Sequence, residues 1–181
     1  RTLSHGNRTV LSRYNFFGST YRNLEKMKLE IERKFLVKDN WPQPVSGMHC
    51  IQGYISANKQ KIVRVRIMDD KAWLTIKALK TALTRIEYEY EIPVDDAKIL
   101  LENLCIKPLI EKIRFIVSEF DNKWEIDEFL GENSGLIVAE VELEEEDQLI
   151  KLPDWLGDEV SHEPKYFNSN LATNPYKNWE K

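Results

Sequence analysis

Pairs of like-charged side chains recur at alternate positions along this sequence, and their types suit phosphate and metal chemistry. Glu30 and Glu32 are separated by one residue, as are Arg64 and Arg66. Side chains at i and i+2 share one face of a β-strand. Arginine donates forked hydrogen bonds to phosphate oxygens, and carboxylates are the hard oxygen ligands that Mg²⁺ and Mn²⁺ prefer. A surface that combined both pairs would suit a phosphorylated ligand together with a divalent metal.

Most of the predicted strands carry such a charged face, and the sign of the charge is sorted by strand. Runs such as Glu87/Glu89 and Glu140/Glu142 place like charges on neighbouring positions of one face, where they repel. Water is the ordinary compensation for a charged strand face. The alternative is a charged ligand that is held where several strands converge.

The pattern of alternation predicts the elements that would position these side chains. Strands are predicted at 28–37, 48–57, 61–68, 72–78, 85–92, 109–118, 122–130 and 135–144. Helices are predicted at 95–104 and 145–151, with weaker helical signals over 164–170. Consecutive strands with few helices favour an antiparallel sheet or barrel. An eight-stranded barrel has just enough interior for side chains or a small ligand, and charges pointing inward would need water or a ligand there.

Length and composition exclude several other classes. The chain has 181 residues and a net charge of −4, so it suits one domain and has no global basic field for nucleic acid. No apolar run reaches the roughly 20 residues of a membrane span. Cys50 and Cys105 lack metal-ligand spacing, and a reducing cytoplasm is the simplest setting for them.

Residues 1–26 are basic and poor in acids. We expect them to be a weakly structured or non-native extension, with an organellar transit peptide as the alternative, and 27–181 to be the functional domain.

The charged strands carry a series of short motifs that follow one another in a defined order. The first is Glu30-Ile31-Glu32-Arg33-Lys34, which matches an ExExK signature. It is followed in order by QGY (52–54), VRVR (63–66), LTIK (74–77), RIEYEYEIP (85–93), EKIRF (111–115), WEIDEF (124–129) and AEVELE (139–144). In this order the chain resembles the CYTH superfamily, also called triphosphate tunnel metalloenzymes, from residue 27 to about residue 170. It looks most like the short bacterial members, although Lys165 stands where their RYYNS-like segment would have arginine.

The resemblance implies a fold and an activity. The expected fold is mainly β (α+β), a closed eight-stranded antiparallel tunnel barrel with a charged interior and a few outer helices. The expected activity is metal-dependent hydrolysis of inorganic tripolyphosphate to pyrophosphate and phosphate, with Mg²⁺ or Mn²⁺, because no base-recognition feature is present. Thiamine or nucleoside triphosphatase, class IV adenylate cyclase and a non-catalytic polyphosphate-binding module are the alternatives. The expected partner is the triphosphate alone, without nucleic acid or membrane, and a homodimer is left open.

The resemblance also implies roles for individual residues. The expected phosphate-binding residues are Lys34, Arg64, Arg66, Lys77, Lys112 and Arg114. The expected metal ligands are Glu30, Glu32, Glu140 and Glu142. The residues expected to take part in catalysis are Lys34, Glu87, Glu89 and Asp127, and which carboxylate would serve as the general base is left open.

Overall fold

The computed structural model describes residues 29–58, 60–81 and 83–179, and its elements follow the alternation of the sequence closely. The strands are β1 (Leu29–Val37), β2 (Met48–Asn58), β3 (Lys61–Met68), β4 (Lys71–Leu79), β5 (Thr84–Ile92), β6 (Ile110–Glu119), β7 (Asn122–Phe129), β8 (Ile137–Glu142) and β9 (Leu156–Glu159). The helices are α1 (Val94–Asn103) and α2 (Asn168–Leu171), with short 3₁₀ turns η3 (Gly131–Asn133), η4 (Pro164–Tyr166) and η5 (Tyr176–Asn178). All eight predicted strands are present, and so is the helix predicted at 95–104. The predicted extension over residues 1–26 lies outside the described residues.

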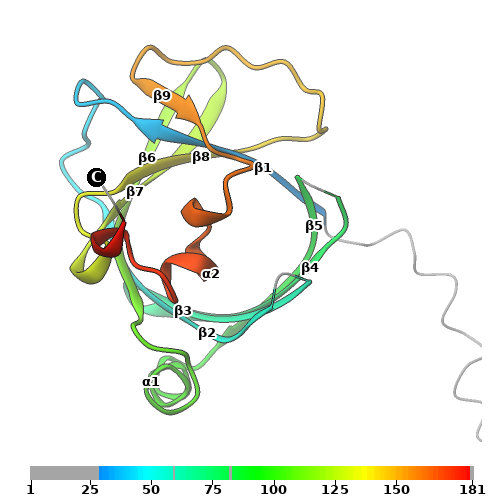
Figure 1. The fold of residues 1–181 in the computed structure, drawn as a ribbon, viewed down its shortest axis with the longest axis vertical. Helices are drawn as coiled ribbons and strands as arrows, with labels where there is room; N and C mark the ends of the chain where they lie inside the picture. Colours follow the sequence, from blue (N-terminus) through cyan, green and yellow to red (C-terminus); the bar gives the residue numbers. More distant parts are fainter. Residues whose placement is uncertain (1–28, 59, 82, 180–181) are drawn as a thin grey trace, which may run out of the picture.

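Eight antiparallel strands close into a ring (Figure 1). The order β5-β4-β3-β2-β6-β7-β8-β1 is closed by a short pairing of β1 with β5, in which Leu29–Ile31 lies beside Thr84–Ile86. Strand β9 adds to the other part of β1, outside the ring. The predicted fold class, a closed eight-stranded antiparallel barrel with a charged interior and few helices, is confirmed.

The register of the strands places the charged faces inside the ring. Glu32 lies opposite Glu142, and Lys34 lies opposite Glu140, across the β1–β8 pair. On the outer face, α1 packs over β3 and β4, where Val65 and Ala72 are buried. Because side chains alternate along each strand, the same alternation that turns charges inward presents apolar residues outward, and the helix covers part of them.

A second group of apolar residues covers the outside of β1, β6, β7 and β8. Trp124 is fully buried there, 5.9 Å from the ring of Phe35 and 5.6 Å from the ring of Trp155. The segment between β8 and β9 supplies part of this cover through Leu143 and Trp155. The rigid aromatic packing on the outside holds β1 and β8 in register, and these two strands carry most of the acidic side chains inside.

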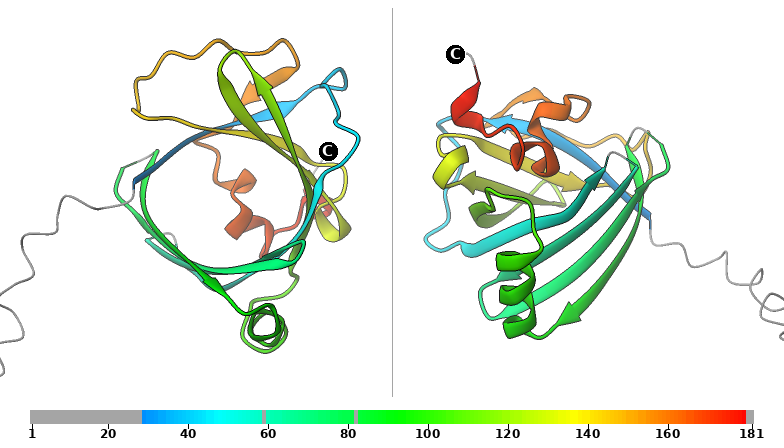
Figure 2. Two further views of the ribbon diagram at one scale, coloured as in Figure 1. Left: turned by 180° about the vertical axis from the view of Figure 1, so that it is seen from behind. Right: turned by 60° about the horizontal axis from the view of Figure 1, so that its bottom comes forward.

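The C-terminal segment closes one end of the ring. Turn η4 and helix α2 enter the ring from one end, as the dark orange coiled elements inside the ring in Figure 2 show. Leu171 and Ala172 are buried against inward-facing residues of the strands, including Tyr54, Ile62 and Phe129. We call residues 164–172 the plug. The plug makes the interior of the barrel end on an apolar cluster instead of running through the molecule.

Two predictions of secondary structure were wrong or incomplete. Residues 145–151 form a turn and irregular chain instead of a helix. The carboxylate of Glu146 accepts hydrogen bonds from the hydroxyls of Thr81 and Thr84, which tie this stretch to the β4–β5 connection. Strand β9 was not predicted. Over residues 29–58, 60–81 and 83–179, the structure contains no helix with the length and apolar character needed to span a membrane.

Candidate active site

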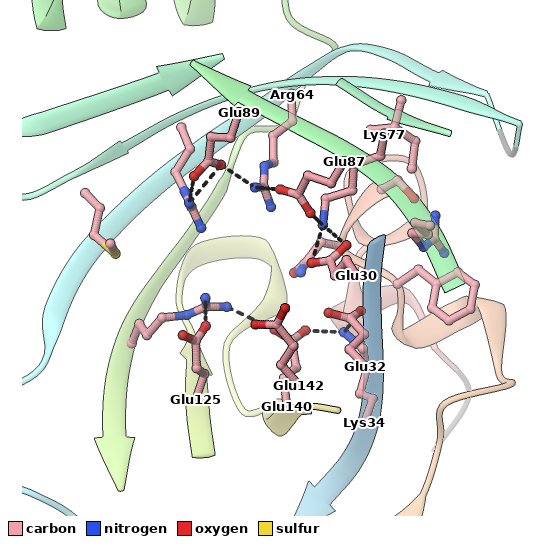
Figure 3. A pocket seen from close by; sticks show the side chains of 18 of the residues that line it. Glu30, Glu32, Lys34, Arg64, Lys77, Glu87, Glu89, Glu125, Glu140 and Glu142 are labelled. Carbon is pink, nitrogen blue, oxygen red and sulfur yellow. Dashed lines mark hydrogen bonds and ion pairs between the residues drawn. The ribbon is translucent and has the colours of Figure 1, made fainter. Parts of the chain in front are cut away.

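The interior of the ring holds a cavity of about 770 Å³ that is lined mainly by charged side chains. Figure 3 shows them in two facing rows, one from β3, β4 and β5 and the other from β1, β7 and β8. The charged residues of the lining are Glu30, Glu32, Lys34, Arg64, Arg66, Lys77, Arg85, Glu87, Glu89, Arg114, Lys123, Glu125, Glu140 and Glu142. The volume suits a small ligand, and the charges suit an anion together with a cation.

One row consists of basic side chains that are already paired with acids, and we call it the basic wall: Arg64, Arg66 and Lys77 with Glu87 and Glu89. A guanidinium nitrogen of Arg64 lies 3.2 Å from Glu89, and one of Arg66 lies 3.1 Å from the same carboxylate. The ammonium of Lys77 lies 2.8 Å from Glu87. Burial raises the pKa of both carboxyls, but these cations outweigh it, so the pKa values of Glu87 and Glu89 lie below the ordinary value. Both acids therefore stay ionised at neutral pH.

The basic wall also has hydrogen-bond donors in reserve. The Nε atoms of Arg64 and Arg66 are buried and have no partner among the described residues. A buried donor without a partner is unfavourable, and a phosphate oxygen could satisfy it only if the guanidinium group turned towards the cavity. The wall thus has the charge to hold a phosphate chain.

The floor of the cavity is a dense network around Arg114. Its Nε and Nη2 atoms donate to the two carboxylate oxygens of Asp127, each at 2.7 Å, and Nη2 also lies 3.0 Å from Glu140. Lys34 pairs with Glu140 and Lys112 pairs with Asp127. Burial opposes ionisation of Glu140, but Lys34 and Arg114 outweigh it and hold its pKa well below the ordinary value.

Three further acids lie on β1 and β8. Glu32 and Glu142 have little counter-charge, whereas Glu30 lies opposite Arg85 of β5 and is paired with Lys77. We call Glu30, Glu32 and Glu142 the acid seam. Glu32 and Glu142 are register partners, and the nearest cation to Glu32, the Lys34 ammonium, is 3.9 Å from its carboxylate. Burial and then the charge of Glu140 raise the pKa of Glu32, while burial and then Glu30 raise that of Glu142. The pKa of Glu30 is raised by burial despite Lys77, whose ammonium is 2.6 Å away.

The acid seam fits a divalent cation in charge and in chemistry. Directly opposed carboxylates destabilise a sheet, and a bound cation would relieve that repulsion. Carboxylate oxygens are the ligands that Mg²⁺ takes, normally one or two of them together with waters and substrate phosphates. Within the part of the chain that the structure describes, no three acidic, histidine or cysteine side chains already form a metal-binding group. Phosphate oxygens or side-chain rotation would have to complete the coordination.

The structure brings most of the predicted site residues together. Of the predicted phosphate-binding set, Lys34, Arg64, Arg66, Lys77 and Arg114 line the cavity, and Lys112 does not. Lys112 lies fully buried beneath the floor, between Asp127 and the ring of Phe129. Asp127, predicted to be catalytic, is also completely buried and outside the lining. Glu140, predicted to ligate metal, is occupied by Lys34 and Arg114.

Several lining residues were not among the predicted site residues. Arg85 precedes Glu87 by two positions, so the alternation of β5 already placed it on the inner face. Phe167, Asn168 and Ser169 reach the cavity from the plug. They belong to the RYYNS-like segment, but the sequence did not place them in the cavity, because their position depends on how the C-terminal segment folds back into the ring. Tyr54 also lines the cavity, and its buried hydroxyl accepts a hydrogen bond from Gln52 at 2.9 Å.

Comparisons with known proteins agree with this geometry. The inorganic triphosphatase of Acetivibrio thermocellus is 51% identical over 155 residues, which cover 85% of this chain and 99% of that protein. The inorganic triphosphatase of Nitrosomonas europaea is 34% identical over 150 residues, which cover 79% of this chain and 96% of that protein. A crystal structure of an inorganic triphosphatase superposes with a TM-score of 0.58 at 31% identity, covering 79% of this chain and 93% of the other.

The family model described as the CYTH domain matches residues 28–176. This range contains every strand of the ring and every residue of the cavity lining. The resemblance seen in the order of the motifs is confirmed. On the arrangement of its barrel, its cavity and these matches, the chain belongs to the CYTH domain family.

Proposed function

We propose that this protein is an inorganic triphosphatase that hydrolyses tripolyphosphate to pyrophosphate and phosphate with Mg²⁺ or Mn²⁺. The observation that carries the proposal is the cavity itself, where a wall of basic side chains faces an acid seam in which Glu32 and Glu142 have little counter-charge. The two relatives named inorganic triphosphatases support the choice of substrate. A passive anion-binding site would need the bases but would gain nothing from the uncompensated acids.

The basic residues would bind the phosphate chain. Arg64, Arg66 and Lys77 supply positive charge from the basic wall, and Lys34 and Arg114 add positive charge on the other side of the cavity. Each cation is now paired with a carboxylate, so binding exchanges an internal partner for a phosphate oxygen. The existing ion pairs keep the cations oriented before the substrate arrives. Such preorganised charge is the main contribution that a protein makes to phosphoryl transfer.

The acid seam would hold the metal. We assign Glu30, Glu32 and Glu142 as the first ligands, with Glu140 as a support that orients Lys34 and Arg114. When bound, the metal would neutralise phosphate charge and lower the pKa of a water molecule. In hydrolysis, a water oxygen forms a bond to a terminal phosphorus, and the water passes one proton to a carboxylate of the cavity. The bridging P–O bond breaks, pyrophosphate leaves with the electron pair of that bond, and the water oxygen remains on the released phosphate.

The carboxylates of the basic wall and the floor differ in what they can do. Glu87 and Glu89 line the cavity and are ionised, so either one is placed to orient the attacking water or accept its proton. Asp127 is buried outside the lining and makes two hydrogen bonds to Arg114. We therefore propose Asp127 as a positioning residue for Arg114 and Lys112, and Lys112 as part of the same support.

A substrate panel tests the proposal. The purified protein should release phosphate from tripolyphosphate with Mg²⁺ or Mn²⁺, faster than from ATP or thiamine triphosphate, and chelator should abolish the release. Faster formation of cyclic AMP from ATP would instead favour a cyclase. Tight binding of tripolyphosphate with no turnover with any metal would favour a binding module.

The buried free thiols of Cys50 and Cys105 support a proposed cytoplasmic location, since reduced cysteines suit that compartment.

A further inference from the structure

A buried threonine lies behind the basic wall, between two of its charged side chains. Thr75 is on β4, and the strand register places it between Arg64 of β3 and Glu89 of β5. Thr75 is fully buried and is not part of the cavity lining. A ligand in the cavity would therefore contact Arg64 but not Thr75.

The hydroxyl of Thr75 forms hydrogen bonds with both of these neighbours. It donates to Oε2 of Glu89 at 2.7 Å and accepts from Nη2 of Arg64 at 3.1 Å. A guanidinium group can only donate, an ionised carboxylate can only accept, and a hydroxyl has a single proton to donate. The direction of both hydrogen bonds is therefore fixed, and the three groups form one buried chain that ends on Glu89.

Arg64 has two acids near it, and Thr75 favours one of them. Nη2 of Arg64 lies 3.2 Å from Glu89 and 3.8 Å from Glu87, and Figure 3 shows Arg64 between the two. The Thr75 hydroxyl donates to the same oxygen of Glu89 that Arg64 contacts. Without this hydroxyl the guanidinium group would lose one acceptor on the Glu89 side and would be freer to turn towards Glu87.

Thr75 also affects how the two oxygens of Glu89 are used. Oε2 accepts hydrogen bonds from Arg64, Arg66 and Thr75, whereas Oε1, among the described residues, accepts from Arg66 alone. Each carboxylate oxygen has about two sites for acceptance, so Oε2 is fully used and Oε1 can still accept from another donor. The hydroxyl thus fixes the orientation of Glu89 as well as that of Arg64.

From these contacts we propose that Thr75 is a positioning residue, whose hydroxyl holds Arg64 and Glu89 in the orientation that receives a phosphate chain. The proposal rests on the proposed function, because it assigns this role in the binding of a triphosphate. It requires the hydroxyl itself and not only the volume of the side chain. Since Thr75 acts through Arg64 and Glu89, its effect on binding should shrink when Arg64 is removed.

The affinity for tripolyphosphate tests the proposal, and calorimetry without divalent metal measures it without interference from turnover. Thr75→Val keeps the branched shape of the side chain and removes the hydroxyl. It should weaken binding about 3- to 10-fold, the range that corresponds to the net contribution of one hydrogen bond. Thr75→Ser keeps the hydroxyl and should stay within about 2-fold of the wild type.

Thr84→Val is the matched control. Thr84 is also buried and its hydroxyl also donates to a carboxylate, that of Glu146, but neither of these residues lines the cavity. This variant loses a comparable hydrogen bond and should bind tripolyphosphate like the wild type. A double-mutant cycle completes the test, in which Thr75→Val added to Arg64→Ala should weaken binding by less than about 2-fold. Circular dichroism spectra matching wild type establish that each variant is folded.

The outcomes separate this proposal from the proposed function. Wild-type affinity in Thr75→Val would overturn it, and so would an equal loss of affinity in Thr75→Ser or in Thr84→Val. If Thr75→Val does not fold, Thr75→Cys keeps a similar size with a weaker donor, and wild-type affinity in that variant would overturn the proposal. The expected affinities in a protein that never hydrolyses tripolyphosphate would support the role of Thr75 and contradict only the enzymatic proposal.

Discussion

The basic wall and the acid seam face each other across one cavity, yet they solve the problem of buried charge in opposite ways. In the wall, Glu87 and Glu89 neutralise the cations within 3.2 Å, and their pKa values fall below the ordinary value. In the seam, Glu32 and Glu142 repel each other, and their pKa values rise. Each cation of the wall has a carboxylate partner, whereas in the seam the ammonium nearest to Glu32 is 3.9 Å away and, among the described residues, Glu142 forms no salt bridge.

This difference teaches how to distinguish structural from functional charge inside a barrel. A buried carboxylate that is paired and hydrogen-bonded stabilises the fold, because removing it leaves a buried cation without a counter-charge. A carboxylate crowded by other carboxylates destabilises the fold until a ligand binds. Variants of the two regions should therefore separate activity from stability.

The largest effect is expected for Glu32→Gln in the acid seam. Loss of a metal ligand removes several kcal/mol of transition-state stabilisation, which corresponds to a loss of about 1000-fold or more in the rate of tripolyphosphate hydrolysis. The midpoint of urea unfolding in metal-free buffer should stay the same or rise, because one repelling charge is gone. Phosphate release and a urea titration measure both quantities, and a stable variant with wild-type turnover would remove Glu32 from the metal site.

Asp127→Ala is the contrasting variant, with its main effect on stability. It leaves Lys112 and Arg114 buried without their shared carboxylate, a change that costs about 3–5 kcal/mol of unfolding free energy. Chemical denaturation measures this loss, and Glu163→Ala, which removes an exposed acid, is a matched control. If Asp127→Ala were as stable as wild type, the floor network would not be what holds Arg114 in place.

Arg64→Ala should act on substrate binding in the basic wall. Loss of a charged, forked contact with phosphate predicts a rise of about 10- to 100-fold in KM, with a smaller change in kcat. Arg64→Lys should recover only part of the affinity, since lysine lacks the planar fork. Steady-state kinetics with tripolyphosphate give both constants, and an unchanged KM in Arg64→Ala would exclude this contact.

The smallest effect concerns pH and the seam. A carboxyl whose folded pKa is raised adds stability at low pH and loses that contribution as pH rises through the folded pKa. Metal must displace those protons, so its affinity should fall as pH is lowered towards the raised pKa values, which lie above the ordinary glutamate value of about 4.3. At 100 times the dissociation constant, metal adds about 2.7 kcal/mol of stability. The metal-induced rise in melting temperature should therefore be larger at pH 8 than at pH 5, and an equal or reversed difference would contradict the raised pKa values.

Much of this arrangement could be predicted from sequence, because alternation is local and the charges obey it. Glu30, Arg64 and Glu142 were placed on inner faces by counting residues, and the ring then brought them together. Counting gives the face of a residue and not its depth, so Lys112 and Arg114 looked equivalent although only Arg114 reaches the cavity. For the same reason counting did not show that Asp127, predicted to be catalytic, lies outside the cavity lining.

The rest depends on long-range packing that no local pattern records. The plug enters the ring through apolar contacts of Leu171 and Ala172 with strands more than 30 residues away in sequence. The position of Phe167, Asn168 and Ser169 in the cavity lining follows from that contact. Strand β9 is only four residues long and pairs with β1 across most of the chain, which explains why its own sequence gave no signal.

The most direct test of the central claim is to count bound metal in three proteins. Calorimetric titration of Mn²⁺ in the presence of a non-hydrolysable triphosphate analogue should show stoichiometric binding to the wild type and to Glu89→Gln, whose substitution lies in the basic wall. The same titration should show binding lost or at least about 10-fold weaker in Glu32→Gln. Retention of full binding by Glu32→Gln, with loss in Glu89→Gln, would contradict the assignment of the acid seam as the metal site.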